Sequence, residues 1–230
     1  MLIKGKRVIR DKKVEVINPY NDKVIDTLGL SEKNDVSDVI GIAEQGFKIL
    51  KQIPAGRRAQ ILEQASVIIR QRKEDFSRAI ALESGKTINE ARGEVDRAVN
   101  TTKLSALAAM KLTGETVRFD LTGESNKMGF YLRVPLGVVC AITPFNFPLN
   151  LSCHKIGPAI AAGNAIIHKP ATKTPVSGVM LAEALIEAGL PVEGIAVLVG
   201  PGSTIGMALV KHPTVKKISV SVKIPLVLTC

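Results

Sequence analysis

The sequence predicts an α/β protein with a parallel sheet, helices on both of its faces, and further helices and a short β-hairpin ahead of it. Two observations lead to this fold class. From residue 137 onward, short apolar runs alternate with helical patterns, which is typical of βαβ units. Between residues 31 and 112, apolar residues recur with the period of a helix instead.

The first 112 residues divide into two parts. Residues 1–30 are predicted to be β-rich, because the strand at 14–17 runs into turn residues at 18–22. Residues 31–112 are predicted to be consecutive helices, one of which ends at Gly85 and another of which covers 88–110. One apolar helical face consists of Ile61, Leu62, Ala65, Ile68 and Ile69. In the last helix Glu94 stands three residues before Arg97, a spacing that favours an ion pair on the helix surface.

Residues 113–136 are predicted to form a hairpin. Residues 128–134 alternate between apolar and polar side chains, as a strand does. The glycine-containing segment 111–126 is expected to join the helical part to the part that follows.

Residues 137–230 are predicted to form a Rossmann-like α/β part. Strands are expected at 137–142, 165–167, 195–199 and 215–220, with helices at 149–162, 175–188 and 203–211 between them. Gly157 and Pro158 are expected to interrupt the first of these helices. A four-stranded parallel sheet has an open edge, and the apolar tail after residue 219 has no cover, so we expect self-association or poor solubility.

The composition is that of a packed globular protein, with 46% hydrophobic and 23% charged residues in 230. No run of about 18 apolar residues is present, and no apolar stretch follows the basic start, so neither a spanning helix nor a secretory signal is predicted. Three widely spaced cysteines do not suggest a disulfide framework. We therefore expect a cytoplasmic protein that binds no membrane.

The net charge of +10 raises the question of nucleic-acid binding. Aromatic residues make up only 3% of the chain and Trp is absent, so few side chains could stack on bases. The charges are also interspersed and form no block. These features favour a basic surface suited to an anionic cofactor, and no nucleic-acid partner is predicted.

A glycine-rich turn follows the predicted strand at 195–199. Its glycines, Gly200, Gly202 and Gly206, have the spacing G-x-G-x-x-x-G, one residue longer than the dinucleotide-binding fingerprint. Glycines allow a ligand to approach the backbone, and a helix N-terminus favours an anion. A tight turn without any ligand is the alternative interpretation.

Two prolines bracket Asn146 directly after the predicted strand at 137–142. Pro144 and Pro148 restrict the backbone around it, at the end of the sheet where α/β proteins bind ligands. An amide held there can donate a hydrogen bond to a developing oxyanion. Alternatively, Asn146 caps the following helix.

Together these segments resemble the amino-terminal part of the aldehyde dehydrogenase superfamily, and within it most of all archaeal lactaldehyde dehydrogenases. The similarity covers residues 14 to 219. It is carried by VINP at 16–19, LESGK at 82–86, EARGEV at 90–95, RVPLG at 133–137, ITPFNFP at 142–148, IGPAIAAGN at 156–164, KP at 169–170 and GPG at 200–202. The resemblance implies an aldehyde-dehydrogenase-like fold that is incomplete at its C-terminal end.

The resemblance also implies roles for individual residues. Asn146 matches the amide that stabilises the oxyanion of the thiohemiacetal. The positions that match cofactor-binding residues are Ile142, Thr143 and Pro144 beside the nicotinamide, Lys169 and Thr172 at the adenosine ribose, and Gly202 and Gly206 beside the adenine. Many members that prefer NAD have a carboxylate where this chain has Thr172, so we expect NADP to bind at least as well as NAD.

The family's nucleophilic cysteine and its glutamate base match no residue of this chain. Cys140 is expected to be a core residue, Cys153 and His154 do not form a dyad, and Cys230 has no acidic neighbour in sequence. His168 and His212 are expected at a strand and at a helix end, and no spacing suggests a metal site. We therefore expect this chain alone to be inactive, as a truncated or frameshifted product of a longer enzyme.

For the full-length form the resemblance implies NAD(P)-dependent oxidation of a small aldehyde to the acid, by hydride transfer through a thioester. It also implies a homo-oligomer, for which the hairpin at 113–136 would be the oligomerisation-type element, since residues 128–134 resemble the family's assembly strand. Lactaldehyde is the first candidate substrate, and glyceraldehyde 3-phosphate or a semialdehyde is the alternative. A non-catalytic NADP-binding fragment or assembly module is the alternative from another class.

Overall fold

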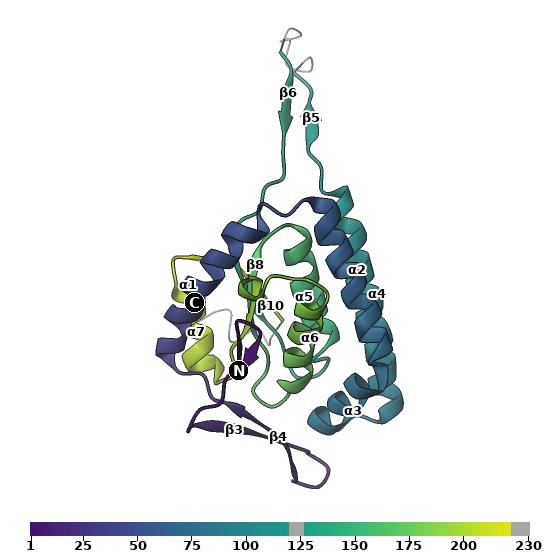
Figure 1. Cartoon of the computed structure of the whole chain (residues 1–230), viewed down its shortest axis with the longest axis vertical. Helices are drawn as coiled ribbons and strands as arrows, with labels where there is room; N and C mark the ends of the chain where they lie inside the picture. The colour runs from purple at the N-terminus through teal and green to yellow at the C-terminus, as the bar shows by residue number, and fades with distance from the viewer. Residues whose placement is uncertain (120–126, 222–230) are drawn as a thin grey trace.

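The computed structural model describes residues 1–119 and 127–221, and a mixed sheet forms its centre (Figure 1). The sheet has six strands in the order β10-β7-β8-β9-β1-β2. Four of them run parallel, namely β7 (Val138–Ile142), β8 (Ala165–Lys169), β9 (Ile195–Val197) and β10 (Val215–Val220). The predicted parallel sheet is thus confirmed.

The N-terminal strands extend this sheet, which the sequence did not indicate. β1 (Leu2–Ile3) pairs antiparallel with β9, and β2 (Lys6–Arg7) pairs antiparallel with β1. Strands of two residues are too short to show an alternating pattern, so no periodicity could predict them. Only the β10 edge of the parallel part is therefore left without a partner strand in the described ranges.

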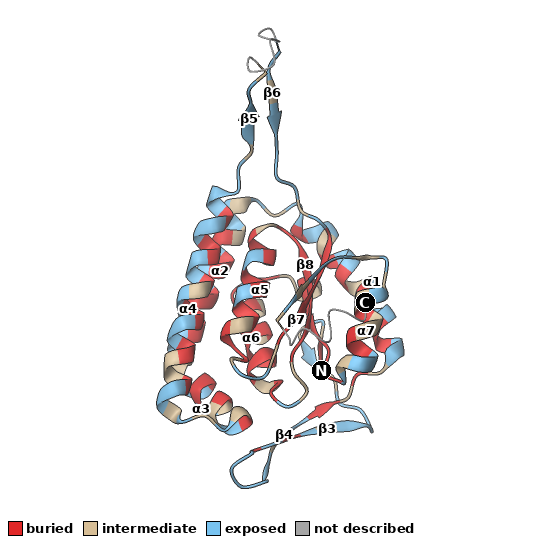
Figure 2. Cartoon of the chain, turned by 180° about the vertical axis from the view of Figure 1, so that it is seen from behind, coloured by how far each residue is buried: buried red, intermediate tan, exposed pale blue. Residues whose placement is uncertain are grey.

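Helices cover both faces of the sheet (Figures 1 and 2). On one face lie α1 (Lys33–Leu50) and α7 (Met207–Lys211), and on the other lie α5 (Asn150–Ala161) and α6 (Val176–Glu187). Every residue of β7 and β8 is buried, as expected for strands packed on both sides.

A third layer of helices packs on α5 and α6. It consists of α2 (Ala55–Gln71), α3 (Lys73–Ser84) and α4 (Ile88–Lys111). The predicted apolar face of α2 is buried throughout. Gly85 ends α3 in the left-handed conformation, with φ of 73°, as its position predicts. Thr87 and Glu90 form a capping box that starts α4.

The expected interruption of the helix at Gly157 and Pro158 is wrong. Both residues lie inside α5, which runs unbroken to Ala161. Pro158 lies on the exposed side, where water can satisfy the carbonyl that the missing amide leaves free. Gly157 instead faces α4, and a Cβ at this position would lie 2.4 Å from Ser105 Oγ. The glycine therefore allows α4 and α5 to approach each other.

Two hairpins project from this body. One pairs β3 (Lys13–Ile17) with β4 (Val24–Gly29), and the other pairs β5 (Glu115–Val117) with β6 (Gly129–Tyr131). The second stands far out from the helices (Figure 1) and exposes Met128 and Phe130. This pairing lies within the segment 113–136 for which a hairpin is predicted, and residues 120–126 lie outside the described part. Within the described part, no helix has the length and apolarity needed to cross a membrane.

Candidate functional site

The candidate site lies at the carboxyl ends of β7, β8 and β9. Ile142 and Lys169 are paired in register at the ends of β7 and β8, and the amide of Thr143 donates to the Lys169 carbonyl at 3.2 Å. The amide of Leu198 donates to the His168 carbonyl at 2.9 Å, which brings the end of β9 alongside. The loops that follow the three strands therefore start from one edge of the sheet.

Lys169 is a buried cation without a carboxylate partner in the described part of the chain. Only 4% of it is exposed, and its Nζ donates to the Pro170 carbonyl at 3.0 Å. Burial lowers the pKa of its ammonium group. Gly206 lies beside its stem, since a Cβ there would be 3.9 Å from Lys169 Cδ. A polar or anionic ligand would supply the interactions that the protein leaves open.

Thr172 connects two of the loops. Its Oγ1 donates to the Gly200 carbonyl at 2.9 Å, which links the loop after β8 to the glycine turn after β9. The hydroxyl proton is thus used within the protein. The side chain brings no negative charge to the site.

The glycines of the turn differ in what they are needed for. A Cβ at Gly200 would lie 2.8 Å from Ile205 Cγ1, so packing of the chain itself requires this glycine. A Cβ at Gly202 would meet nothing within 4 Å. Packing in the described structure therefore does not explain Gly202, and the open space beside it fits the close approach of a ligand.

The helix expected at 203–211 begins differently. Residues Gly202–Gly206 form a wide π turn, and α7 follows from Met207. The amides of Thr204 and Ile205 both donate to the Pro201 carbonyl, at 3.3 and 3.0 Å. Bonds from the third and fourth residues of a turn to the residue before it are those with which a helix begins, so the turn keeps the character of a helix N-terminus.

Asn146 does not cap the helix that follows it. Its side chain is exposed and makes no hydrogen bond with the described residues. The first amides of α5, those of Leu149 and Asn150, donate to Glu94 Oε1 at 2.9 and 3.1 Å. The capping interpretation of Asn146 is therefore wrong, and its amide is free for another partner.

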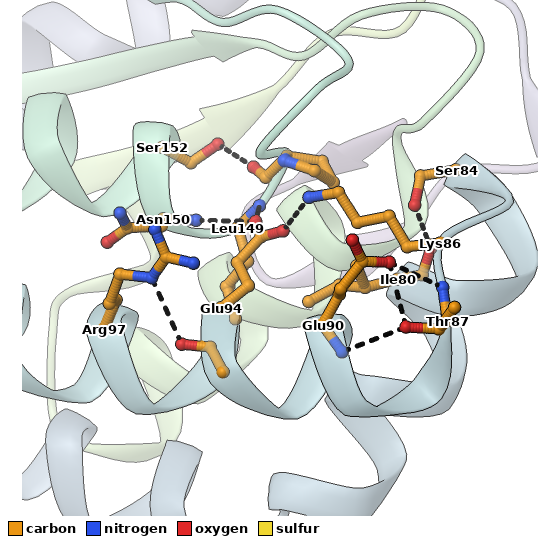
Figure 3. A network of polar contacts seen from close by, with 12 residues as sticks. Ile80, Ser84, Lys86, Thr87, Glu90, Glu94, Arg97, Leu149, Asn150 and Ser152 are labelled. Carbon is orange, nitrogen blue, oxygen red and sulfur yellow. Dashed lines mark hydrogen bonds and ion pairs between the residues drawn. The ribbon is translucent and has the colours of Figure 1, made fainter.

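Glu94 belongs to a buried polar network (Figure 3). Its side chain is fully buried, and Oε2 accepts a hydrogen bond from Lys86 Nζ at 2.6 Å. The expected surface pair with Arg97 is wrong, because Glu94 faces α5. Arg97 donates to the Gly93 carbonyl at 3.4 Å, and its guanidinium lies 5.2 Å from the Phe147 ring centroid.

Glu83 performs the same task for the next helix. It accepts hydrogen bonds from the amides of Val176 and Ser177, at 2.7 and 3.2 Å, where α6 begins. Burial raises the pKa of the Glu83 carboxyl to about 7, against the opposing effect of these amides. Both glutamates lie in segments that carry the family resemblance, but their roles leave no local pattern from which the sequence analysis could have predicted them.

Thr143 turns its side chain away from the strand ends. Its Oγ1 lies 3.0 Å from His168 Nε2, which also lies 3.1 Å from Ser152 Oγ. His168 is fully buried on β8, as expected, and burial lowers the pKa of its imidazole to about 3. A neutral histidine therefore anchors the start of the loop, and only the backbone of Thr143 is available to a ligand.

Cys140 and Cys153 are buried structural residues. Burial raises the pKa of each thiol to about 12, so neither is a reactive thiolate. His154 is exposed on α5 and His212 ends α7, as predicted, while Cys230 lies outside the described residues. No group of side chains in residues 1–119 and 127–221 could hold a metal ion.

Comparisons with known proteins identify the family of the chain. The model of the aldehyde dehydrogenase family matches residues 8–222. The 3-sulfolactaldehyde dehydrogenase of Priestia aryabhattai is 39% identical over 216 residues, which are 94% of this chain and 45% of that protein. The lactaldehyde dehydrogenase of Methanocaldococcus jannaschii is 37% identical over 223 residues, 95% of this chain and 47% of that protein.

Solved structures give the same result. The NADP-dependent glyceraldehyde-3-phosphate dehydrogenase of Bacillus halodurans C-125, complexed with NADP, matches with a TM-score of 0.90 and 35% identity, over 95% of this chain and 47% of that one. The chain thus spans about half the length of the relatives it matches. By sequence and by structure, it belongs to the aldehyde dehydrogenase family.

Proposed function

We propose that this chain is the cofactor-binding part of an enzyme that oxidises a small aldehyde to its acid with NADP or NAD. One observation carries the proposal: the uncommitted amide of Asn146 lies at the same edge of the sheet as the buried, unneutralised Lys169. An amide and a cation at strand ends suit carbonyl chemistry beside a bound anion.

The described residues fit a dinucleotide. Lys169 would bind the adenosine ribose or its 2′-phosphate, and the open space at Gly202 and the position of Gly206 would accept the adenine. The backbone of Ile142, Thr143 and Pro144 would line the nicotinamide. The dinucleotide would supply the acceptor for the hydride that leaves the aldehyde carbon.

Asn146 would act on the aldehyde. When a thiolate attacks the carbonyl carbon, negative charge develops on the carbonyl oxygen, and the Asn146 amide would donate a hydrogen bond to it. Loss of one such donor costs about 3–4 kcal/mol of barrier stabilisation. In the described residues neither thiol can be the attacking group, because Cys140 and Cys153 are buried and protonated.

The preference between cofactors tests the proposed roles of Lys169 and Thr172. We expect the chain to bind NADP at least as well as NAD, and Thr172→Glu to weaken NADP binding at least tenfold with little effect on NAD. A carboxylate about 4 Å from a 2′-phosphate repels it by about 4 kcal/mol at an effective dielectric of 20, before solvent screening. Equilibrium titration of both cofactors measures this, with Thr172→Ser as the control that keeps the bond to Gly200.

Wild-type binding of NADP more than tenfold weaker than of NAD would contradict the cofactor assignment. Equal losses for both cofactors in Thr172→Glu would show instead that the linked loops had been disturbed.

The relatives' names suggest the substrate class. Two relatives are named for lactaldehyde and 3-sulfolactaldehyde, and a structural relative is named for glyceraldehyde 3-phosphate. We propose lactaldehyde, with a semialdehyde or glyceraldehyde 3-phosphate as alternatives. Reduction of NADP by the full-length form in the presence of each aldehyde separates these candidates.

A non-catalytic NADP-binding module is the second candidate function. The two protonated, buried thiols favour it for this chain alone. NADP binding without turnover of any of these aldehydes would support the module, and turnover by the isolated chain would exclude it.

We also propose a cytoplasmic homo-oligomer. The projecting hairpin and the end of α4 expose apolar side chains, among them Met110, Met128, Phe130 and Leu132. Light scattering of the purified chain is expected to give a mass above that of a monomer, and a monomer at all concentrations would contradict this.

A further inference from the structure

The loop that carries Asn146 is held at both of its ends by other parts of the molecule. At its start, Thr143 donates its amide to Lys169 of β8 and directs its hydroxyl to buried His168. Between these contacts and Phe147, the side chain of Asn146 has no bond of its own in the described structure. Its position therefore depends on the residues that fix the two ends.

The far end is held from the helical layer (Figure 3). Lys86 Nζ lies 3.8 Å from the centroid of the Phe147 ring, which is the residue next to Asn146. Glu94 accepts hydrogen bonds from the two amides that follow, those of Leu149 and Asn150. Lys86 and Glu94 also pair with each other at 2.6 Å. Two side chains thus hold three of the four residues 147–150, namely Phe147, Leu149 and Asn150.

Both side chains depend on each other for this task. Glu94 is fully buried, so its charge needs compensation, which Lys86 and the amides at the start of α5 provide. Lys86 in turn lies over the ring only where Glu94 directs its ammonium group. An unpaired carboxylate or an unpaired lysine would turn toward water and release the segment.

We propose that Lys86 and Glu94 are positioning residues that set the place of the Asn146 amide relative to the cofactor, and this rests on the proposed function. A donor to an oxyanion is effective only within a few tenths of an ångström of the right place. Lys86 and Glu94 contact this loop, whereas no hydrogen bond or ion pair in the described residues joins them to Lys169, Thr172 or Gly202. Loss of the pair should therefore affect the nicotinamide half of the site and spare the adenosine half.

The test compares Lys86→Met and Glu94→Gln with a matched control. Both variants keep the length of the side chain. Glu74→Gln breaks the exposed pair between Glu74 of α3 and Arg92 of α4, which lies near the same turn without touching residues 147–150. Lys86→Arg is the conservative variant that should restore much of the wild-type behaviour.

Two measurements apply to the purified chain. The first is hydrogen exchange of individual amides by NMR, in which Leu149 and Asn150 should exchange about tenfold faster in both variants, relative to Val139 and Ile167 in the sheet. The second is binding of NADPH compared with 2′,5′-ADP, which contains only the adenosine half. We expect NADPH to bind about tenfold more weakly in the two variants and 2′,5′-ADP to bind unchanged.

Several outcomes would overturn the proposal. Unchanged exchange at Leu149 and Asn150 would show that the pair does not hold the segment. Equal weakening of both ligands would show a general structural role only. If the wild-type chain bound neither ligand, the proposed function would fail, whereas the exchange rates would still decide whether the pair positions the loop.

Discussion

Glu83 and Glu94 perform the same structural task in different electrostatic settings. Each is buried, each comes from the helical layer, and each accepts the first two amides of a helix behind the candidate site. Glu94 pairs with Lys86, whereas Glu83 forms no ion pair in the described part of the chain. Correspondingly, burial raises the pKa of Glu83 to about 7.

The difference shows what helix amides alone can and cannot do for a buried carboxylate. Two amides and the helix N-terminus satisfy the oxygens of Glu83, but they do not offset the loss of hydration around its charge. A cation in addition, as at Glu94, provides that compensation. The loop with Asn146 is therefore held by a compensated charge, and the loop with Lys169 and Thr172 precedes a helix held by an uncompensated one.

Glu94→Leu is expected to lower the free energy of unfolding by the largest amount. The change leaves two buried amides and Lys86 without their acceptor, and breaking such a pair costs about 3–5 kcal/mol. Urea denaturation followed by circular dichroism measures it. The exposed control Glu74→Gln is expected to leave the urea midpoint unchanged. A Glu94→Leu chain as stable as the wild type would show that the contacts of Glu94 with Lys86 and the two amides do not stabilise the fold.

Glu83 is expected to have a smaller effect on the free energy of unfolding, and this effect depends on pH. Because its pKa is about 7 when folded and 4.5 when unfolded, the folded chain binds the extra proton between these values, so stability falls as pH rises through this window. The fall is at most about 3 kcal/mol. Glu83→Gln should remove this dependence and be at least as stable as the wild type at pH 8.

Denaturation midpoints at pH 5, 6, 7 and 8 provide the measurement for Glu83→Gln. A wild-type chain whose stability rises over this range relative to the variant would show that the amides outweigh the burial of the charge.

The smallest of the three effects is expected for Gly157→Ala. The new Cβ would lie 2.4 Å from Ser105 Oγ and push α5 away from α4, at a cost of about 1–3 kcal/mol. Gly93→Ala, where nothing lies within 4 Å, is the control and should stabilise by up to about 1 kcal/mol.

Gly157→Ala also distinguishes the effect of Glu94 from that of Glu83, since only Glu94 reaches across from α4 to α5. Amide exchange should speed up at Leu149 and stay unchanged at Val176, where Glu83 binds. Equal changes at both amides would mean that the helical layer moves as one unit.

Much of the fold could be predicted because its signals are local. The buried runs of β7 and β8, the apolar face of α2 and the glycine that ends α3 each appear within a few residues of sequence. The strands β1 and β2 could not be predicted, since two residues show no period. The continuity of α5 through Pro158 depends on which side of the helix meets water, and this only the tertiary structure decides.

The candidate site likewise combines residues with local sequence signals and residues whose roles depend on long-range contacts. The prolines around Asn146 and the spacing of the glycines are local signals, and they predicted candidate residues that follow β7 and β9. The roles of Glu94 and Lys86 could not be predicted, because Glu94 accepts hydrogen bonds from amides 55 and 56 residues away in sequence. A charged residue in a helix surrounded by other charges gives the pattern of a surface residue, and only its burial reveals another role.

These long-range bonds also bear on the order of events during folding. The hydrogen bond between Glu94 and Leu149 joins residues 55 positions apart in sequence. The bond between Glu83 and Val176 joins residues 93 positions apart. Neither can form until the helical layer has docked on the helices of the sheet, so the strand-end loops gain their final shape late, after the slow non-local steps. Recovery of ligand binding during refolding should therefore lag behind recovery of helical circular dichroism.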